Sequence, residues 1–462
     1  MSTNQHYDAI VIGSGQAGTP LCTALAGVGL RTGLIEREHV GGTCINEGCT
    51  PTKTMVASGR VAYLARRGPD YGVQTGDVRI DMQRVRQRKR EIVTSFRCGN
   101  QTQIENARNL DLIFGEASFT SPKSVTVVLR TGESVEFTAD RFFLNPGARP
   151  SVPMLDGLND VPFLNSTSIM ELDAVPEHLM ILGGGYVGLE FGQLFRRFGS
   201  KVTIIQTDTQ LLAREDPDVA QEIAKILEED GVSVHLSARA KRVARDGSGI
   251  RLDVEKPNGT FSLLGSHLLV ATGRTPNSDT LHLETAGVKT DDHGFIKVNE
   301  RLETTALGIY ALGDVKGGPA FTHISYDDFR IIRTNVIEKG NATTEGRMVP
   351  YTVFVDPQLG RIGITEKEAR VQKRNYRVAK MPMSNVARAL EVDEARGFMK
   401  AVVDAGTGQI LGAAILGIEG GEIMAMLEVA MMGRIPFPVL REAIFAHPTL
   451  AESLNNLFTH FE

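Results

Sequence analysis

The chain has 462 residues, of which 42% are hydrophobic and 23% are charged, and its formal net charge is −5. This composition is typical of a globular protein with about three domains, and a count of only four cysteines excludes a disulfide-rich scaffold. The mild net charge argues against a nucleic-acid or membrane partner. The sequence shows no signal-peptide pattern and no apolar run long enough to span a bilayer, so we expect a protein of the reducing cytoplasm.

The first predicted unit begins with a short buried strand at residues 7–12. The turn GSGQAG at residues 13–18 leads into a helix, and a second strand at residues 31–35 ends in Glu36. Glycines at these spacings permit a tight turn, close packing of helix on strand and the approach of a pyrophosphate to the helix N-terminus. An acid about 20 residues later can accept hydrogen bonds from a ribose. The combination predicts a dinucleotide-binding unit.

The next segment, GGTCINEGCTPTK at residues 41–53, holds Cys44 and Cys49 with four residues between them. In a helix these side chains would lie slightly more than one turn apart. A disulfide across so short a loop adds little stability, so the pair is better suited to being opened and closed. Lys53 would raise the local positive potential and favour a thiolate. The alternative interpretation is a pair of buried cysteines in an ordinary helix.

Residues 82–108 are predicted to form a long polar helix. Its basic run at residues 84–90 is interpreted as a solvated face rather than a nucleic-acid site. Cys98 in this helix and Cys22 in the first helix have no partner nearby in sequence, and we predict structural roles for both. From residue 112 to residue 144 the pattern changes to short alternating strands.

A second dinucleotide unit is predicted at residues 178–206. The strand LMILG leads into GGGYVG at residues 183–188, a helix follows, and the strand KVTII precedes Gln206. An internal duplication of the nucleotide fold accounts for this repeat of the opening pattern. An acid at the end of the strand would favour a free 2′-hydroxyl and a nearby arginine a 2′-phosphate, but Gln206 is neither. The choice between NAD and NADP therefore stays open at this point.

Two similar segments, GAR at residues 147–149 and ATGR at residues 271–274, suggest that the chain leaves the first domain, builds the second and then returns. A later strand ends in Gly313 and Asp314, where a carboxylate can accept hydrogen bonds from a polyol. An ordinary turn or helix cap is the alternative there. We predict a discontinuous first domain of residues 1–150 and 275–345, a second domain of residues 151–274 and a C-terminal domain of residues 346–462.

The predicted C-terminal domain mixes strands with a Met-rich helix. The strands are expected at residues 351–355, 398–403 and 409–415, and the helix at residues 422–432. We interpret the methionines as core or dimer-interface residues and predict no metal site. In the motif HPTLAE, Glu452 would orient the imidazole of His447 and raise its basicity, so that it moves protons for a thiol. The alternative is a helix start, because Thr449 and Glu452 have the spacing of a capping box.

The nature and order of these motifs, over essentially the whole chain, resemble the FAD-dependent pyridine nucleotide–disulfide oxidoreductases. Dihydrolipoamide dehydrogenase, glutathione reductase and mercuric reductase belong to that family. The resemblance implies an α/β fold with two Rossmann-like dinucleotide-binding domains, one for FAD and one for NAD(P), and a C-terminal α+β dimerisation domain. It also implies a homodimer with shared active sites, in which His447 and Glu452 reach the active site of the partner subunit.

By the same resemblance, Cys44 is the interchange thiol that attacks substrate, and Cys49 is the charge-transfer thiol beside the isoalloxazine. Lys53 pairs with Glu190 near the flavin N5, and Tyr186 covers the nicotinamide pocket and moves on binding. The implied FAD-binding residues are Gly13, Gly15, Gly18, Glu36 and Asp314, and the implied NAD(P)H-binding residues are Gly183, Gly185 and Gly188. Further implied cofactor-binding residues are Lys53, Gly42, Thr43, Gly147, Gly313, Gln206, Gly273 and Arg274.

These roles imply that electrons pass from NAD(P)H through FAD and a Cys44–Cys49 disulfide to a small disulfide, or in reverse from a dithiol. Two features depart from the family pattern: Glu47 places a negative charge between the cysteines, and Asn145-Pro146 replaces the usual Ala-Thr. The sequence ends NNLFTHFE without the C-terminal cysteine pair of mercuric reductases and keeps the His-Pro-Thr-x-x-Glu motif, which favours an organic disulfide. The alternative functions are a metal-ion or quinone reductase and a non-catalytic flavoprotein component of a complex.

Overall fold

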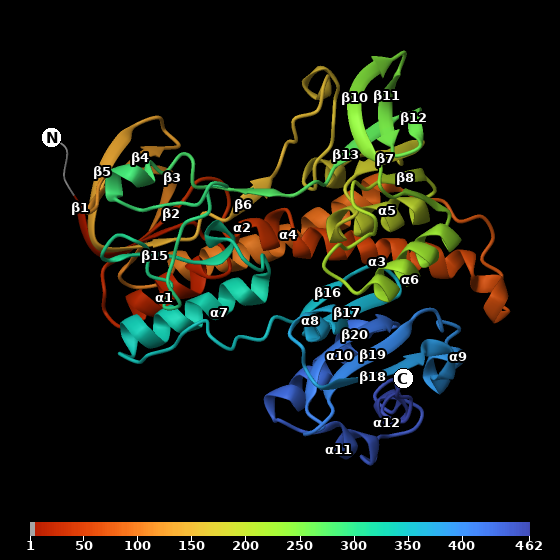
Figure 1. Ribbon diagram of the computed structural model, residues 1–462. Coiled ribbons are helices and arrows are strands. Elements are labelled where there is room, and N and C mark those ends of the chain that lie inside the picture. Colours follow the sequence, from red (N-terminus) through yellow and green to blue (C-terminus); the bar gives the residue numbers. More distant parts are fainter. Residues whose placement is uncertain (1–4) are drawn as a thin grey trace. The chain divides into compact units, whose positions relative to one another are not determined.

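The computed structural model describes residues 5–462 and divides into two compact units (Figure 1). The first unit comprises the chain up to Met55, Gln83–Ser151 and Gly273–Arg347. The second unit comprises Val56–Met82, Val152–Thr272 and Met348–Glu462. The division into three domains that the sequence suggests stays a prediction, whereas the mixed α/β class is confirmed by the elements of both units.

The first unit is built on a six-stranded sheet in the order β1-β2-β3-β4-β5-β15, with an additional pairing of β1 and β5. Its strands are β1 (Gln5–Ile12), β2 (Thr32–Glu36), β3 (Leu110–Ser121), β4 (Ser124–Leu129), β5 (Ser134–Leu144) and β15 (Ile309–Ala311). Strand β4 is antiparallel to β3 and β5, and all other pairings are parallel. The carboxyl ends of the parallel strands therefore meet at one edge, which is where such sheets bind ligands.

Strand β1 shows why this sheet is buried on both faces. Successive side chains of a strand point to opposite faces, and Ile10 and Ile12 belong to one buried cluster whereas Ala9 and Val11 belong to another. The second cluster also contains Cys22 of helix α1 (Gly18–Gly27), which agrees with its predicted structural role. Burial raises the pKa of the Cys22 thiol to about 12, which leaves it protonated and unreactive at neutral pH.

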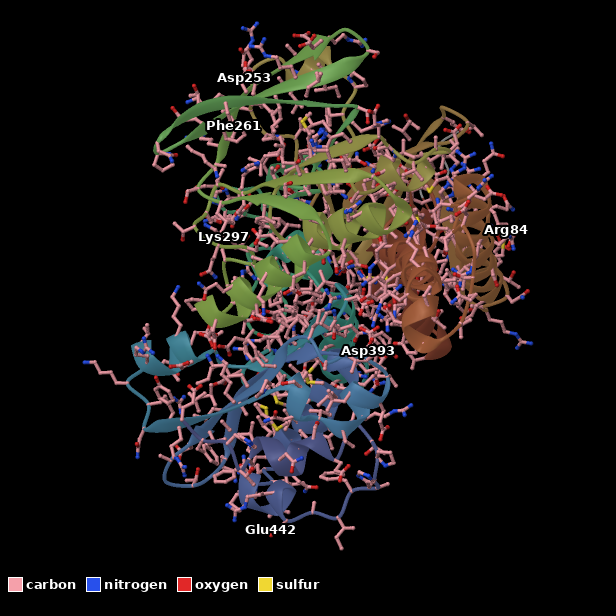
Figure 2. The ribbon with its side chains drawn as sticks, turned by 90° about the vertical axis from the view of Figure 1, so that its right-hand side faces the viewer. Arg84, Asp253, Phe261, Lys297, Asp393 and Glu442 are labelled. Atoms are coloured by element: carbon pink, nitrogen blue, oxygen red, sulfur yellow. The ribbon has the colours of Figure 1, made fainter. Side chains whose placement is uncertain are left out.

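Helices of the first unit carry the cysteine segment and flank the sheet. They are α1, α2 (Gly42–Asn46), α4 (Met82–Glu105), α7 (Thr322–Ile332) and the start of α3 (Cys49–Arg66), which continues into the second unit. In the basic run of α4, the Arg84 side chain is 63% exposed (Figure 2) but Lys89 is only 4% exposed, so the predicted solvated face holds for part of the run. Cys98 of α4 is exposed, and its predicted structural role stays a prediction. Among the helices of residues 5–462, none combines the length and apolar character of a membrane span.

Two short strands join the segments that precede and follow the inserted chain. Strand β6 (Ala148–Pro150) pairs with β14 (Arg274–Pro276) in antiparallel register. Gly147 and Gly273, which precede these strands, both take positive φ angles of 73° and 141°. The backbone turns there in a way that other residues adopt only with strain. The two similar sequence segments thus lie side by side in the first unit.

The second unit holds a four-stranded parallel sheet in the order β13-β7-β8-β9. Its strands are β7 (His178–Leu182), β8 (Lys201–Ile205), β9 (Val232–His235) and β13 (His267–Val270), and its helices are α5 (Tyr186–Phe198) and α6 (Pro217–Glu229). An antiparallel sheet of β10 (Arg239–Asp246), β11 (Gly249–Lys256) and β12 (Gly259–Gly265) lies between β9 and β13 in sequence. Figure 2 labels Asp253 and Phe261 on that sheet.

The glycine turns of the two sheets are packed in the same way, which agrees with the predicted internal duplication. A Cβ on Gly18 would lie 2.0 Å from the carbonyl oxygen of Gly13, and a Cβ on Gly188 would lie 2.1 Å from that of Gly183. In both turns the helix approaches its strand too closely for any side chain.

A five-stranded antiparallel sheet in the order β16-β17-β20-β19-β18 forms the C-terminal part of the second unit. Its strands are β16 (Tyr351–Val353), β17 (Gln358–Gly363), β18 (Tyr376–Pro382), β19 (Phe398–Asp404) and β20 (Ile410–Gly417). The helices are α8 (Glu366–Val371), α9 (Ala387–Glu391), α10 (Gly420–Met432), α11 (Phe437–Arg441) and α12 (Ser453–Leu457). In the Met-rich α10, Met424 is buried in the core whereas Met432 is 66% exposed. One face of this helix therefore belongs to the core, and the other remains apolar and accessible.

Candidate active site

The cysteine segment forms two helices rather than one. Cys44 lies in α2 and Cys49 is the first residue of α3, because Glu47 between them takes a φ of −142° and ends α2. A Cβ on Gly48 would lie 2.9 Å from the carbonyl oxygen of Thr43, so this tight reversal requires glycine. The reversal brings the cysteine side chains into hydrogen-bond contact, and both are thiols in this structure.

Thr322 lies beside the two thiols. Its Oγ1 is 3.3 Å from Cys49 Sγ, and its side chain also hydrogen-bonds with Cys44. Thr322 is the first residue of α7, an 11-residue helix whose N-terminal end carries a partial positive charge. A hydroxyl and a helix N-terminus in this position both stabilise a thiolate. Thr322 belongs to none of the motifs described above, because it is 273 residues from Cys49 in sequence.

The environment of Cys44 favours its protonated thiol form. The hydrogen bond with Cys49 and burial raise the pKa of the Cys44 thiol, while Thr322 and the Lys53 ammonium lower it. The two raising effects outweigh the two lowering ones, so the protonated Cys44 thiol is favoured. Lys53 favours the thiolate, as predicted, whereas its pairing with Glu190 of the second unit stays a prediction.

Asn145, which the sequence presented only as a departure from the family pattern, holds the glycine turn of the first unit. Its Oδ1 accepts the N–H of Gly18 at 2.9 Å, and its Nδ2 donates to the carbonyl of Leu312 at 2.9 Å. A Cβ on Gly13 would lie 2.2 Å from the Asn145 carbonyl oxygen, and one on Gly15 would lie 2.8 Å from Asn145 Oδ1. Asn145 thereby ties the turn after β1 to the end of β15.

A pocket beside this turn is lined by Gly13, Glu36, Gly42 and Thr43, among other residues of the first unit. Glu36 at the end of β2 accepts the N–H of Ser14 at 3.1 Å. The pocket combines the backbone of the glycine turn at Gly13 with the Glu36 carboxylate at the next strand end. These are the groups that bind the pyrophosphate and ribose of a dinucleotide.

Asp314 lies in a 3-10 turn (Gly313–Lys316) at the end of β15. Burial raises the pKa of its carboxyl against the opposing charges of Arg274 and Lys316, and Arg274 Nε is 3.8 Å from Asp314 Oδ2. The turn is fixed by Asp328 of α7, which is fully buried and accepts the N–H of Gly313 at 2.8 Å. The fold therefore places Asp314, whose side chain is 24% exposed, in a turn that Asp328 fixes.

The glycine turn of the second unit leaves space where a phosphate would approach. Gly185 precedes α5, and a Cβ on it would meet no atom within 4 Å. A Cβ on Gly183 would instead lie 2.4 Å from the carbonyl oxygen that follows β13. Gln206 follows β8, and its Oε1 accepts the N–H of Gly184 at 2.8 Å. The N-terminus of α5 is thus open to an anion while the rest of the turn is closely packed.

Helix α5 also carries two predicted residues. Tyr186 is its first residue and is 38% exposed. Glu190 is 2% exposed, and its Oε1 accepts the N–H of Phe354 at 2.9 Å. Glu190 therefore fastens the segment after β16 to α5, in addition to any role in electron transfer.

His447 and Glu452 are brought together, as predicted. His447 Nδ1 lies 2.9 Å from Glu452 Oε2, and the His447 side chain is 68% exposed. The N–H of Glu452 also donates to Thr449 Oγ1 at 3.3 Å, but α12 begins only at Ser453, so Thr449 is not its N-cap. With Nδ1 engaged by the carboxylate, the exposed ring presents Nε2 for proton transfer.

Two family models match the chain in succession. The model described as pyridine nucleotide-disulphide oxidoreductase matches residues 7–328, and the one described as its dimerisation domain matches residues 349–458. The chain belongs to the pyridine nucleotide-disulphide oxidoreductase family. Its members use FAD and NAD(P)H, so this chain is a flavoprotein oxidoreductase with a redox disulfide centre, and its dimerisation domain supports a homodimer.

Relatives extend over the full chain. A probable pyridine nucleotide-disulfide oxidoreductase RclA of Escherichia coli is 39% identical over 98% of this chain and 99% of its own length. A mercuric reductase of Lysinibacillus sphaericus is 34% identical over 97% of this chain and 81% of its own length. A dihydrolipoyl dehydrogenase of Haloferax volcanii is 32% identical over 97% of this chain and 94% of its own length. A solved Cu(II) complex of the HOCl-induced flavoprotein disulfide reductase RclA from Escherichia coli has a TM-score of 0.90 at 38% identity, over 99% of both chains.

Proposed function

We propose that this chain reduces a small organic disulfide with NAD(P)H, with Cys44 and Cys49 as its redox disulfide, and that dithiol oxidation in reverse uses the same residues. The observation that carries the proposal is the contact of the two thiols with each other and with Thr322 at the N-terminus of α7. The His447–Glu452 pair supplies the proton transfer that thiol–disulfide exchange needs. Because the chain keeps the His447–Glu452 pair, we favour an organic disulfide over a metal ion as the substrate.

FAD lies against the glycine turn of the first unit in this proposal, and NAD(P)H against that of the second. Bound FAD supplies the two-electron reduction of the disulfide at the expense of NAD(P)H. The residues that hold FAD are Gly13, Gly15, Gly18, Glu36, Gly42, Thr43 and Asp314. The residues that hold NAD(P)H are Gly183, Gly185, Gly188 and Gln206. Further residues that support the cofactors are Gly147, Gly273, Arg274 and Gly313. Lys53 pairs with Glu190, and Tyr186 covers the nucleotide pocket.

The chemistry of the chain's own groups begins with the proton on Cys44. Because its pKa is raised, a base must remove this proton, and His447 of the partner subunit, oriented by Glu452, does so. Cys44 Sγ then attacks one sulfur of the substrate disulfide and forms a mixed disulfide, and the leaving thiolate takes the proton from the imidazole. Cys49 Sγ attacks Cys44 Sγ, closes the protein disulfide and releases the second thiolate, which is protonated from solvent.

The organisation proposed for the chain follows from these assignments. Residues 1–150 and 275–345 form the FAD domain, residues 151–274 the NAD(P) domain, and residues 346–462 the dimerisation domain. Pairing of β6 with β14 supports the discontinuous first domain, and the match of the dimerisation model to residues 349–458 supports the third. A homodimer with shared active sites in the cytoplasm completes the proposal.

Anaerobic titration of the purified flavoprotein with NADH or NADPH tests the proposed function. We expect about two new thiols per chain, counted with a chromogenic disulfide reagent after denaturation. A long-wavelength absorption band should accompany them, from the Cys49 thiolate beside the flavin. Loss of the flavin absorption without new thiols would show that the cysteines do not take the electrons, and disulfide reduction would then be rejected.

Reduction of a metal ion is the second candidate function. One solved relative is a Cu(II) complex and others are named mercuric reductases, and two adjacent thiols are soft ligands of the kind that such ions prefer. Within residues 5–462, no cluster of three or more His, Cys, Asp or Glu side chains is arranged to hold a metal ion. NADH-dependent reduction of Cu(II) or Hg(II) that exceeds disulfide turnover would favour this candidate.

Replacing Thr322 with valine is expected to raise the pKa of the thiol pair by about one to two pH units. A hydrogen bond to a charged group contributes about 1.5–3 kcal/mol, and each pH unit corresponds to about 1.4 kcal/mol. The pH dependence of iodoacetamide alkylation of the reduced protein measures this shift. Thr322→Ser keeps the hydroxyl and is the matched control. If the valine variant shows the same pH dependence of alkylation as the parent, the Thr322 hydroxyl does not stabilise the thiolate.

Replacing Asp314 with asparagine is expected to stabilise the apoprotein at neutral pH by about 1 kcal/mol and to weaken FAD binding. The folded-state pKa of Asp314 is raised above 3.8, so its ionisation costs stability as the pH rises through the raised value. The difference in melting temperature between variant and parent should therefore vanish below pH 3.8 and be full near pH 7. Thermal unfolding of both apoproteins across this range measures it, with the exposed Asp292→Asn as control. Equal stability at every pH would contradict the prediction.

A further inference from the structure

Gln206 occupies the position in the second glycine turn that Glu36 occupies in the first. Glu36 accepts the N–H of Ser14 at 3.1 Å, and Gln206 Oε1 accepts the N–H of Gly184 at 2.8 Å. Gln206 is only 8% exposed. The Gln206 amide therefore stabilises the turn. An acid that contacts the ribose would have to be another residue of this unit.

The other end of the Gln206 amide holds an acid. Its Nε2 donates to Asp208 Oδ2 at 2.8 Å, so this bond engages one of the two carboxylate oxygens of the exposed Asp208. The main chain is fixed too, because the carbonyl of Asp208 accepts the N–H of Ser237 at 2.9 Å. Asp208 is thus an anchored carboxylate just beyond the carboxyl end of β8. Dinucleotide-binding folds place the acid that contacts the ribose in this region.

Charges in this segment favour a ribose without a phosphate. Residues 206–212, QTDTQLL, contain no lysine or arginine, and the first cation after β8 is the exposed Arg214. A 2′-hydroxyl can donate a hydrogen bond to the Asp208 carboxylate. A 2′-phosphate would instead meet the fixed negative charge of Asp208, and the only cation on this loop, Arg214, comes near its far end.

We propose that the chain binds NADH in preference to NADPH and that Asp208, positioned by Gln206, determines this specificity. The inference rests on the proposed NAD(P)H site of the second unit and names the nucleotide that it takes. Asp208 contacts the ribose, whereas Gln206 is a positioning residue. Without the Gln206 amide, the carboxylate keeps its charge but loses its fixed place.

The test combines turnover with binding measured independently of turnover. We expect kcat/KM to favour NADH by at least about tenfold, or about 1.4 kcal/mol. In calorimetric titrations of the FAD-loaded protein, 5′-AMP should bind more tightly than 2′,5′-ADP. Asp208→Asn should reduce both preferences to within about threefold. Gln206→Ala should raise KM for NADH by a larger factor than it lowers kcat.

Asp246→Asn is the matched control, because Asp246 is an exposed acid in the same unit, at the end of β10, and it should preserve both preferences. Equal or better use of NADPH by the parent protein, or an unchanged Asp208→Asn variant, would overturn the inference. Selective loss of 2′,5′-ADP binding in Arg214→Gln would overturn it as well, by revealing a phosphate site. Failure of the proposed function would look different. Neither NADH nor NADPH would then produce new protein thiols, but the binding of 5′-AMP and 2′,5′-ADP would still measure the specificity of the nucleotide site.

Discussion

Replacing Cys44 with serine is expected to lower disulfide reduction by at least about a thousandfold, because the attacking group is a thiolate and a serine hydroxyl cannot form a mixed disulfide. FAD content should be unchanged, since the Cys44 side chain contacts Cys49 and Thr322 rather than the glycine turn. The measurement is kcat/KM for a small organic disulfide with NADH, together with the flavin absorbance of the purified variant.

Cys98→Ser provides the control for this substitution. Cys98 is an exposed cysteine on α4, and its loss should change kcat/KM by less than about twofold. A Cys44→Ser variant that keeps most of its activity would mean that electrons reach the acceptor without the disulfide. The metal-ion or quinone reductase would then become the better description.

The parts of the site that the sequence predicts are those set by local rules. Glycines that take close backbone contacts, such as Gly13 and Gly18, leave a fixed spacing in the sequence because the turn, the strand and the helix are neighbours along the chain. The pairing of His447 with Glu452 is equally local, across five residues. Fold class and cofactor type follow from these short patterns.

Contacts between distant segments are not predictable in this way. Asn145 reaches Gly18 across 127 residues, Thr322 reaches Cys49 across 273, and Asp328 supports Gly313 from the next helix. Each is a single polar side chain without a periodic pattern, so only the packing of the sheet edge reveals it. Asp328 is buried but stands next to the partly exposed Asp327 in the polar sequence THISYDDFRII, so the sequence does not single it out.

The break between α2 and α3 illustrates a second limit. Two cysteines with four residues between them could lie in a single helix, and helix propensity alone does not forbid one. The structure instead uses Gly48, whose missing side chain lets the chain approach the Thr43 carbonyl. The effect is chemical as well as geometric, because it places Cys49 at the start of a helix, where a thiolate is favoured.

Replacing His447 with glutamine is expected to lower kcat/KM for the disulfide by about 10²–10⁴-fold at neutral pH, the usual contribution of a positioned acid–base group. The physical reason lies in the pair of thiols. Burial and the hydrogen bond with Cys49 raise the pKa of Cys44, so in the absence of the imidazole only solvent can take its proton. Activity of the variant should therefore rise steadily with pH, and the gap to the parent should narrow in alkaline buffer.

Steady-state rates from neutral to alkaline pH decide this prediction. Glu452→Gln keeps the imidazole but removes the carboxylate that orients it at 2.9 Å, and it should lose about tenfold. His460→Gln replaces an exposed histidine whose Nδ1 is 2.8 Å from the Asn456 carbonyl oxygen, and it should behave like the parent. A His447→Gln variant that is slow but has the parent's pH profile would indicate that the imidazole supports the dimer rather than moving protons. The base that serves Cys44 would then have to be another group.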